Sequence, residues 1–180
     1  MAAYQQQSPR LRTPPPKKDA GKLWEYALNA LGRRALSEGE LRQKLRGKAA
    51  DQADIEPLMA KLREYGYLND ERFAESYASA RQSNQGLGKQ RVLRDLRTRR
   101  VAGETAEQAV AKVYEGTDEA ALIEDYLTRK YRGKNLREYL AEPKHLASTY
   151  RKLRYAGFSS AATVRVLRRY TERAAEIDED

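Results

Sequence analysis

The feature that most constrains the fold is a pattern of apolar residues that occurs three times along the chain. Apolar residues recur at spacings of three and four, which is typical of amphipathic helices, and no stretch alternates as a half-buried strand does. Each repeat opens with an apolar quartet at positions i, i+1, i+4 and i+5, namely Leu23-Trp24-Ala27-Leu28, Phe73-Ala74-Tyr77-Ala78 and Leu122-Ile123-Tyr126-Leu127. The pattern predicts an all-α protein.

Two further helices are expected after each quartet, always in the same order. The second helix of each repeat is marked by Leu45, Leu96 and Leu153, which are 51 and 57 residues apart. The third helix is marked by apolar pairs, namely Met59 and Leu62, Val110 and Val113, and Leu167 and Tyr170. Three helices in one order, repeated in register, predict three tandem three-helix repeats. Each repeat is too small to be very stable alone, so we expect them to stack into an elongated, curved array.

Helix-capping residues give the expected boundaries. Ser37 to Glu40 form a capping box, Asn69, Thr117 and Ser159 are placed at helix starts, and Gly66, Gly116 and Gly157 can end helices. Pro143 is expected in a long connection that begins at Tyr131. The predicted segments are a disordered basic tail at 1–21, three-helix repeats at 22–66, 67–116 and 117–171, and an acidic C-terminal tail at 172–180.

Several classes of protein are excluded or disfavoured by composition. The 180 residues include no cysteine and a single histidine, His145, so we expect no metal site, no cofactor and no catalytic residues. No run of 18 apolar residues could span a bilayer, and the first 18 residues lack the apolar core of a signal peptide. We therefore expect a cytoplasmic protein. Gly86-Leu87-Gly88-Lys89 lacks the full phosphate-loop signature, which favours a flexible connection between helices.

Positive charge is concentrated in the second helix of every repeat. The chain has 35 Lys and Arg against 26 Asp and Glu, a net charge of 35 − 26 = +9. A charged face is often only a solvated one, but its recurrence at one position in three repeats favours a continuous basic stripe that binds phosphates. The candidate binding residues are Arg42, Lys44, Arg46, Lys89, Arg91, Arg94, Arg97, Arg99, Arg100, Arg151, Lys152 and Arg154.

Several motifs resemble the RecX family, the regulators of the RecA recombinase. The most specific is Gly66-Tyr67-Leu68-Asn69-Asp70-Glu71-Arg72-Phe73-Ala74. Ser37-x-x-Glu40-Leu41 and Leu153-Arg154-x-x-Gly157-Phe158-Ser159 are also similar to that family, and the resemblance covers about residues 22–171. Two positions depart from its pattern: Ala156 replaces an arginine, and Arg100 replaces a glycine that is common before the valine of the second repeat.

The resemblance implies a non-enzymatic modulator, most often an inhibitor, that binds in the groove of RecA–DNA filaments. Such proteins reduce ATP hydrolysis, strand exchange and filament persistence in homologous recombination, DNA repair and the SOS response. The expected partners are the RecA filament and, weakly and without sequence preference, single- and double-stranded DNA. A monomer is expected, with no membrane contact.

Two other functions remain open at this point. A helix-turn-helix-like protein acting on DNA directly would also place a basic helix in a three-helix unit, and its dimers would select a palindromic site. A scaffold that binds protein alone would have no affinity for DNA, so reversing the charge of its basic residues would leave DNA binding unchanged.

If Phe73 is fully buried, we expect its replacement by alanine to lower the free energy of unfolding by about 3–5 kcal/mol.

Overall fold

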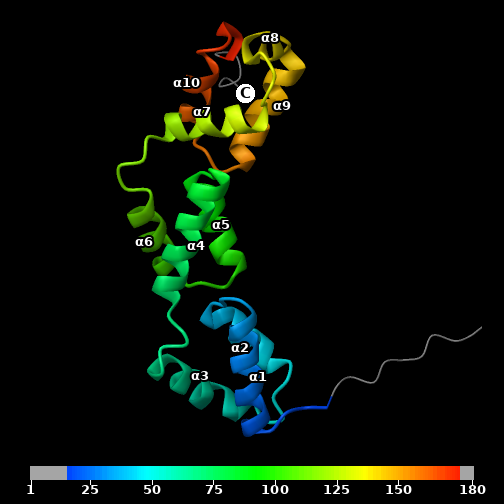
Figure 1. Ribbon diagram of the computed structural model, residues 1–180, viewed down its shortest axis with the longest axis vertical. Helices are drawn as coiled ribbons and strands as arrows, with labels where there is room; N and C mark the ends of the chain where they lie inside the picture. Colours follow the sequence, from blue (N-terminus) through cyan, green and yellow to red (C-terminus); the bar gives the residue numbers. More distant parts are fainter. Residues whose placement is uncertain (1–15, 175–180) are drawn as a thin grey trace, which may run out of the picture.

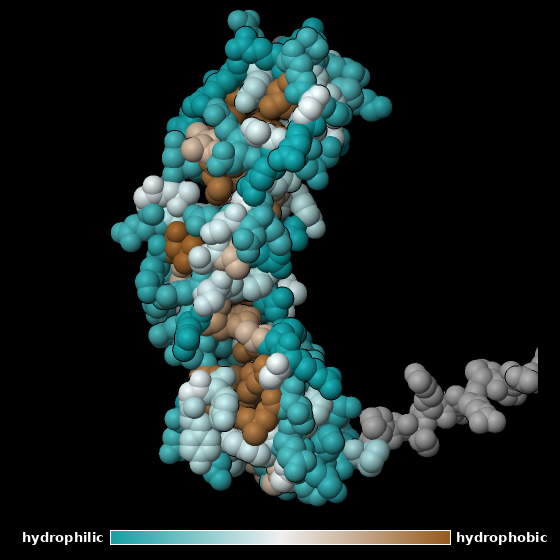
Figure 2. All heavy atoms as spheres, in the orientation of Figure 1, coloured by the Kyte–Doolittle hydropathy of each residue, from teal (hydrophilic) through white to brown (hydrophobic). Residues whose placement is uncertain are grey.

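The computed structural model describes residues 16–174 and confirms the all-α fold class. The regular elements of this range are helices, and they form an elongated, curved body (Figure 1). Most of the face drawn in Figure 2 is hydrophilic, and its apolar areas are separate patches spread along the long axis. This shape is the one expected for stacked repeats rather than for one globular core.

Three groups of helices follow one another along the long axis. The first group contains α1 (Ala20–Arg33), α2 (Glu38–Arg46), the 3₁₀ turn η1 (Gln52–Asp54) and α3 (Ile55–Glu64). The second contains α4 (Asp70–Gln85), α5 (Lys89–Thr98) and α6 (Gly103–Val113). The third contains α7 (Glu119–Lys130), α8 (Leu136–Ala141), α9 (Pro143–Tyr155) and α10 (Ser160–Leu167). Unit boundaries near residues 66 and 116 stay a prediction.

The third group has one helix more than expected. The long connection after Tyr131 contains α8, whose start is capped by Asn135 as its side chain accepts a hydrogen bond from the Arg137 amide at 3.1 Å. Leu140 of α8 is fully buried. Pro143 lies in no connection, because it is the first residue of α9, where its missing N–H has no intrahelical partner to lose.

The ends of the described chain pack onto the fold. The Lys18 amide donates to the Lys48 carbonyl at 2.8 Å, the Ala50 amide donates to the Lys18 carbonyl at 2.7 Å, and α1 already begins at Ala20. Near the other end, Ala174 is fully buried. The structured chain therefore reaches into both expected tails. The rest of those tails, residues 1–15 and 175–180, lies outside the described residues.

Most of the expected helix starts are confirmed. The Ser37 capping box is complete, and Asn69 and Ser159 accept hydrogen bonds from backbone amides of α4 and α10. The prediction for α7 is wrong by one residue, because Asp118 rather than Thr117 is its N-cap. An aspartate at this position also places a negative charge at the positive end of the helix dipole.

Each group of helices has its own apolar core. The second and third cores share two partly buried residues, Leu87 and Leu122, which pack against both. The first core has no residue in common with the second. Phe73 is only half-buried and stacks on Tyr77 with ring centroids 6.1 Å apart, so the cost of a fully buried phenylalanine does not apply to it.

Candidate nucleic-acid interface

The second helices of the three groups are joined end to end. Ser37, the N-cap of α2, donates a hydrogen bond from its hydroxyl to the carbonyl of Arg99, the C-cap of α5. One repeat further on, the amide of Gly88, the N-cap of α5, donates to the carbonyl of Ala156, the C-cap of α9, at 2.9 Å. At both junctions the N-cap residue of one second helix therefore donates a hydrogen bond to the C-cap carbonyl of another, and α9, α5 and α2 follow one another along the molecule (Figure 1).

These links align the helix dipoles. At each junction the negative carboxyl end of one helix meets the positive amino end of the next, an arrangement that favours the contact. We call the surface formed by these three helices and the two residues that follow α5 the basic column; it consists of the twelve candidate residues from Arg42 to Arg154 named above. The sequence could place the charges in each repeat, but only the junctions show that they succeed one another in space.

The two junctions depend on close backbone approach at glycine. A Cβ built on Gly88 would lie 2.4 Å from the carbonyl carbon of Gly157, and one built on Gly39 would lie 2.4 Å from the Arg100 carbonyl oxygen. Gly88 is also buried. The segment Gly86–Lys89 does connect two helices, α4 and α5, as expected, but it is a packed contact between two groups of helices rather than a flexible linker.

Arg100 has an unfavourable backbone conformation. Its φ is +61°, and it is the one non-glycine residue of the described chain with positive φ. It occupies the same place after α5 as Gly157 does after α9, which explains why glycine suits this position.

We expect Arg100→Gly to raise the free energy of unfolding by about 1 kcal/mol, because left-handed backbone costs an L-residue roughly that amount. Arg100→Ala is the control, since it removes the same charge but keeps the Cβ and its strain. The measurement is urea unfolding followed by circular dichroism. Equal stability of the two variants would contradict a backbone origin.

Nine of the twelve basic-column residues are exposed. The three partly buried ones are Arg42, Arg91 and Arg99. These three are also held by carboxylates, with Arg42 2.8 Å from Glu56 and Arg91 2.9 Å from Asp95. The hydrogen bond that Arg42 donates to Glu56 raises the pKa of Arg42, and the one that Arg91 donates to Asp95 raises the pKa of Arg91. Residues held in this way are less available to an outside anion.

A fourth column residue is paired at the surface. Arg97 lies 3.4 Å from Glu107, and both side chains are more than half exposed, so the ion pair contributes little to the stability of the fold. Within residues 16–174, the remaining eight column residues form no ion pair: Lys44, Arg46, Lys89, Arg94, Arg100, Arg151, Lys152 and Arg154. These eight are the column's available cations.

Glu40 ties the column to the first junction. Its carboxylate receives two hydrogen bonds from Arg34, each 3.0 Å long, and lies 3.4 Å from Arg99. Burial by itself would raise the pKa of Glu40, but the hydrogen bonds from Arg34 and Ser37 and the charges of Arg34 and Arg99 together hold that pKa below its usual value. The carboxylate therefore stays ionised and fixes Arg99 in place.

Two aromatic side chains accompany the arginines. The guanidinium groups of Arg81 and Arg99 both lie over the ring of Tyr77, at 4.8 and 4.7 Å from its centroid. Arg91 covers the ring of Tyr155 at 4.6 Å, and Tyr155 is 69% exposed. Sequence reasoning did not include Tyr155 in the site. Its position two residues after the buried Leu153, on the outward side of the helix, was the available signal.

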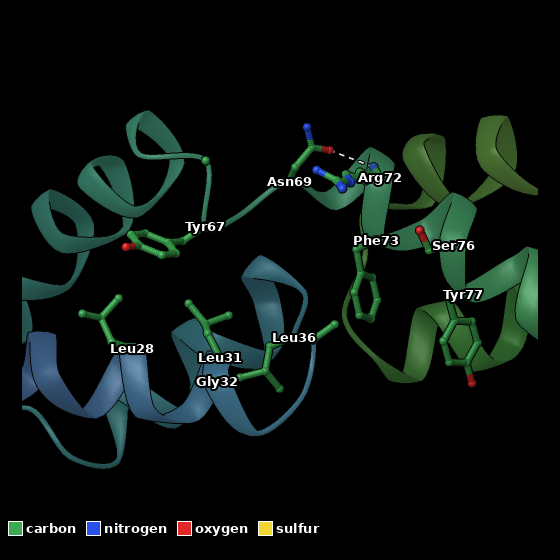
Figure 3. A pocket seen from close by; sticks show the side chains of 12 residues that line it. Leu28, Leu31, Gly32, Leu36, Tyr67, Asn69, Arg72, Phe73, Ser76 and Tyr77 are labelled. Carbon is green, nitrogen blue, oxygen red and sulfur yellow. Dashed lines mark hydrogen bonds between the residues drawn. The ribbon is translucent and has the colours of Figure 1, made fainter.

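An apolar groove separates the first two groups of helices (Figure 3). Leu28 and Leu31 of α1 line one side, and Phe73 and Tyr77 of α4 line the other. Its volume is about 720 Å³. Tyr67, which is 53% exposed, also lines it. Sequence reasoning missed this groove because its walls come from two repeats whose relative placement no local pattern reveals.

His145 lies near the start of α9, where its side chain contacts neighbouring residues of the fold. Its ring stacks on Tyr139 at 4.1 Å, and its Nδ1 atom lies 3.1 Å from a Glu142 carboxylate oxygen. In the part of the chain that the structure describes, no cluster of three or more His, Cys, Asp or Glu could hold a metal ion. Nor does any helix in that part have the length and apolar character needed to cross a membrane.

The fold and surface thus define an elongated protein of tandem helical units with a basic column along it. Known proteins are similar to this chain in sequence and in fold. Family models of the first and second three-helix domains of RecX match residues 24–62 and 69–110. The regulatory protein RecX of Amycolatopsis mediterranei is 32% identical over 167 residues, which cover 92% of this chain and 94% of that protein. The chain belongs to the RecX family of regulatory proteins.

A second relative supports the same family, and a solved structure supports the fold. The regulatory protein RecX of Syntrophotalea carbinolica is 33% identical over 149 residues, covering 81% of this chain and 92% of that protein. The crystal structure of RecX from Lactobacillus salivarius superimposes with a TM-score of 0.63 at 20% identity, covering 84% of this chain and 96% of that one. At that identity the structural match speaks for the fold alone.

Proposed function

We propose that this protein is a non-enzymatic regulator that binds along the groove of RecA–DNA filaments in the cytoplasm. In this proposal it lowers ATP hydrolysis, strand exchange and filament persistence, and it acts as a monomer. Membership in the RecX family supports the regulatory role. The observation that carries the choice of a filament is the end-to-end alignment of α9, α5 and α2, which turns three local charge clusters into one basic column.

The length of the column suits an extended polyanion. The three helices contain 13, 10 and 9 residues, so at 1.5 Å per residue they span about 50 Å, junctions excluded. A nucleic-acid strand presents a phosphate roughly every 3.4 Å along its axis in duplex form. A column of this length faces many phosphates at once, whereas a compact helix-turn-helix domain reads only a few base pairs.

The junctions argue against the helix-turn-helix alternative. In that class the recognition helix contacts base edges with its N-terminal residues. Here the N-termini of α2 and α5 are occupied, because Ser37 and Gly88 contact the ends of the next second helices. Binding without sequence preference, through exposed side chains along the column, fits this arrangement better.

The test of the proposal is RecA ATP hydrolysis on single-stranded DNA with increasing amounts of this protein. We expect the wild type to inhibit, and the exposed pair Arg94→Glu with Arg97→Glu to require about tenfold more protein, because two charges are reversed and the net charge of the column falls by four units. Helical circular dichroism should be unchanged. Lys61→Glu with Arg165→Glu is the control, since both residues are exposed, belong to third helices and give the same change in net charge.

Lack of any effect by the wild type at several-fold excess over filament sites would contradict the proposal. Equal loss in the column and control variants would mean that net charge, not the column, matters. If the wild type inhibits RecA yet has no affinity for DNA, the protein acts as a scaffold toward protein alone.

A further inference from the structure

Two arginines from different groups of helices line one polar cavity. Arg94 of α5 and Arg154 of α9 share its lining with Gln90, Phe158, Ser159 and Ser160. The cavity has a volume of about 360 Å³ and lies at the junction where α5 meets the end of α9. Its two arginines are 60 positions apart in sequence, so no local motif marks the site.

Both guanidinium groups are anchored by backbone carbonyls. Arg94 Nη2 donates to the Tyr155 carbonyl oxygen at 2.9 Å, and Arg154 Nη1 donates to the Phe158 carbonyl oxygen. Each guanidinium has five N–H donors, so most of them remain for a ligand. Neither arginine has a carboxylate partner within residues 16–174. Anchoring therefore orients the two side chains and leaves their charge uncompensated.

A carboxylate already occupies the nearby start of α10. Glu119 accepts hydrogen bonds from the Ser159 amide at 2.8 Å and from the Ser159 hydroxyl at 2.7 Å. The carboxylate of Glu119 thus already compensates the positive end of the α10 helix dipole. The attraction of the cavity for an anion rests on the two arginines, with Gln90 as a neutral hydrogen-bonding group beside them.

We propose that this cavity binds a backbone phosphate of nucleic acid, held by Arg94 and Arg154 together. The inference rests on the proposed function, and it assigns one point of the basic column as a discrete phosphate site. Two planar guanidinium forks match the several oxygen atoms of one phosphodiester group. The location at a column junction places the bound phosphate in line with the cations of α5 and α9.

The experiment measures the affinity of the full chain for a fluorescein-labelled single-stranded oligonucleotide by anisotropy. Arg94→Gln and Arg154→Gln are each expected to weaken binding about fivefold, since a charge-assisted hydrogen bond is lost. The double variant should weaken it about tenfold, less than the product of the single effects, because both residues hold one phosphate. The slope of log affinity against log salt should fall by about one phosphate contact in the double variant.

The control pair is Arg94→Gln with Lys44→Gln, which removes the same charge from two helices. Their effects should multiply, because Lys44 lies on α2, away from the cavity. Multiplying effects for Arg94 and Arg154 would overturn the inference, as would an unchanged affinity. Inorganic phosphate at constant ionic strength should not displace the oligonucleotide; displacement at low millimolar concentration would show a site for free phosphate instead.

Failure of the inference and failure of the proposed function can be told apart. If the wild type inhibits RecA but the Arg94 and Arg154 variants bind the oligonucleotide normally, the regulatory role survives and the phosphate site does not. If the wild type binds the oligonucleotide with the expected coupling but leaves RecA unaffected, the site survives and the role does not.

Discussion

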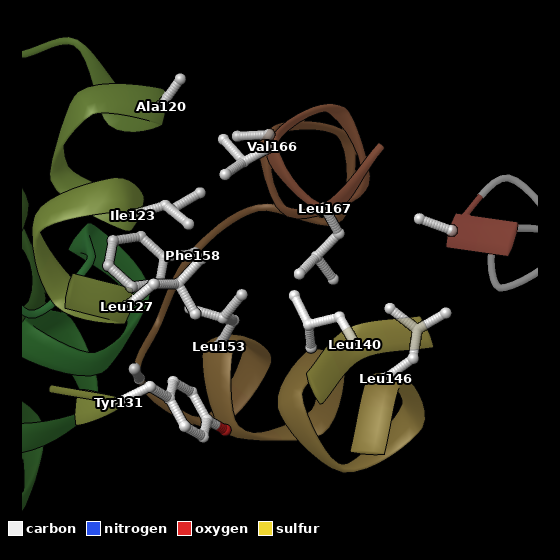
Figure 4. Close-up of a cluster of buried hydrophobic side chains, with 13 residues drawn as sticks. Ala120, Ile123, Leu127, Tyr131, Leu140, Leu146, Leu153, Phe158, Val166 and Leu167 are labelled. Carbon is white, nitrogen blue, oxygen red and sulfur yellow. The ribbon is translucent and has the colours of Figure 1, made fainter. Parts of the chain in front are cut away.

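Replacing Phe158 by alanine is expected to lower the free energy of unfolding by about 3–5 kcal/mol. Phe158 is fully buried in the third core, where its ring lies beside Ile123 and Leu127 of α7 (Figure 4). It also meets the ring of Tyr126 edge-on at 5.8 Å. Truncation removes the ring from this packed site and leaves a cavity that the surrounding helices can fill only in part. Urea unfolding followed by circular dichroism measures the change.

Phe73→Ala is the matched control, because Phe73 is the other of the two phenylalanines in the chain. It is half-buried and lines the groove between the first two groups, so its removal leaves no closed cavity. We expect a loss of about 1–2 kcal/mol. A loss at Phe73 as large as that at Phe158 would mean that the groove is closed in solution.

The second large effect is expected for Gly157→Ala. The φ of Gly157 is +97°, and a Cβ built there would lie 2.2 Å from the Arg91 amide nitrogen, a backbone atom that cannot move alone. Left-handed strain and overpacking add, for an expected loss of about 2–5 kcal/mol in the free energy of unfolding. Because the clash lies at the α5–α9 junction, the same variant should also weaken filament binding by separating two segments of the basic column.

Gly116→Ala separates the two contributions. Gly116 also has positive φ, at +68°, but no atom lies within 4 Å of a Cβ built there. We expect a loss of about 1–2 kcal/mol from strain alone, with RecA inhibition unchanged. Equal losses at Gly116 and Gly157, measured by the same urea unfolding, would show that the close approach at the junction contributes nothing.

Much of the fold could be predicted from local sequence. The apolar quartets beginning at Leu23, Phe73 and Leu122 lie on the first helices of the three groups, and Ser37 and Asn69 cap the helices assigned to them. These features depend on side chains within one or two helical turns of each other, so they can be read in a linear sequence. The extra helix α8 was missed because its six residues are too few to show a periodic pattern.

The candidate site was predictable only in part. The twelve cations could be assigned to second helices, but four of them prove to be held by carboxylates. Asp95 lies one helical turn from its partner Arg91 on the same helix face. The other three carboxylates, such as Glu56, come from sequence distances that no helix pattern predicts. The shared cavity of Arg94 and Arg154 was also hidden. Its existence depends on how the second and third groups pack, which local spacing does not encode.

The sequence by itself determined a chain of helical units with charge at one place in each, because helix formation and amphipathic burial are local or periodic. Only the tertiary structure decided that these charges form one column. That outcome depends on backbone contacts between units, at Gly39 with Arg100 and at Gly88 with Gly157, where the absence of a side chain lets one helix end reach the next. A glycine in a sequence shows that close approach is allowed; the partner it approaches is fixed by packing.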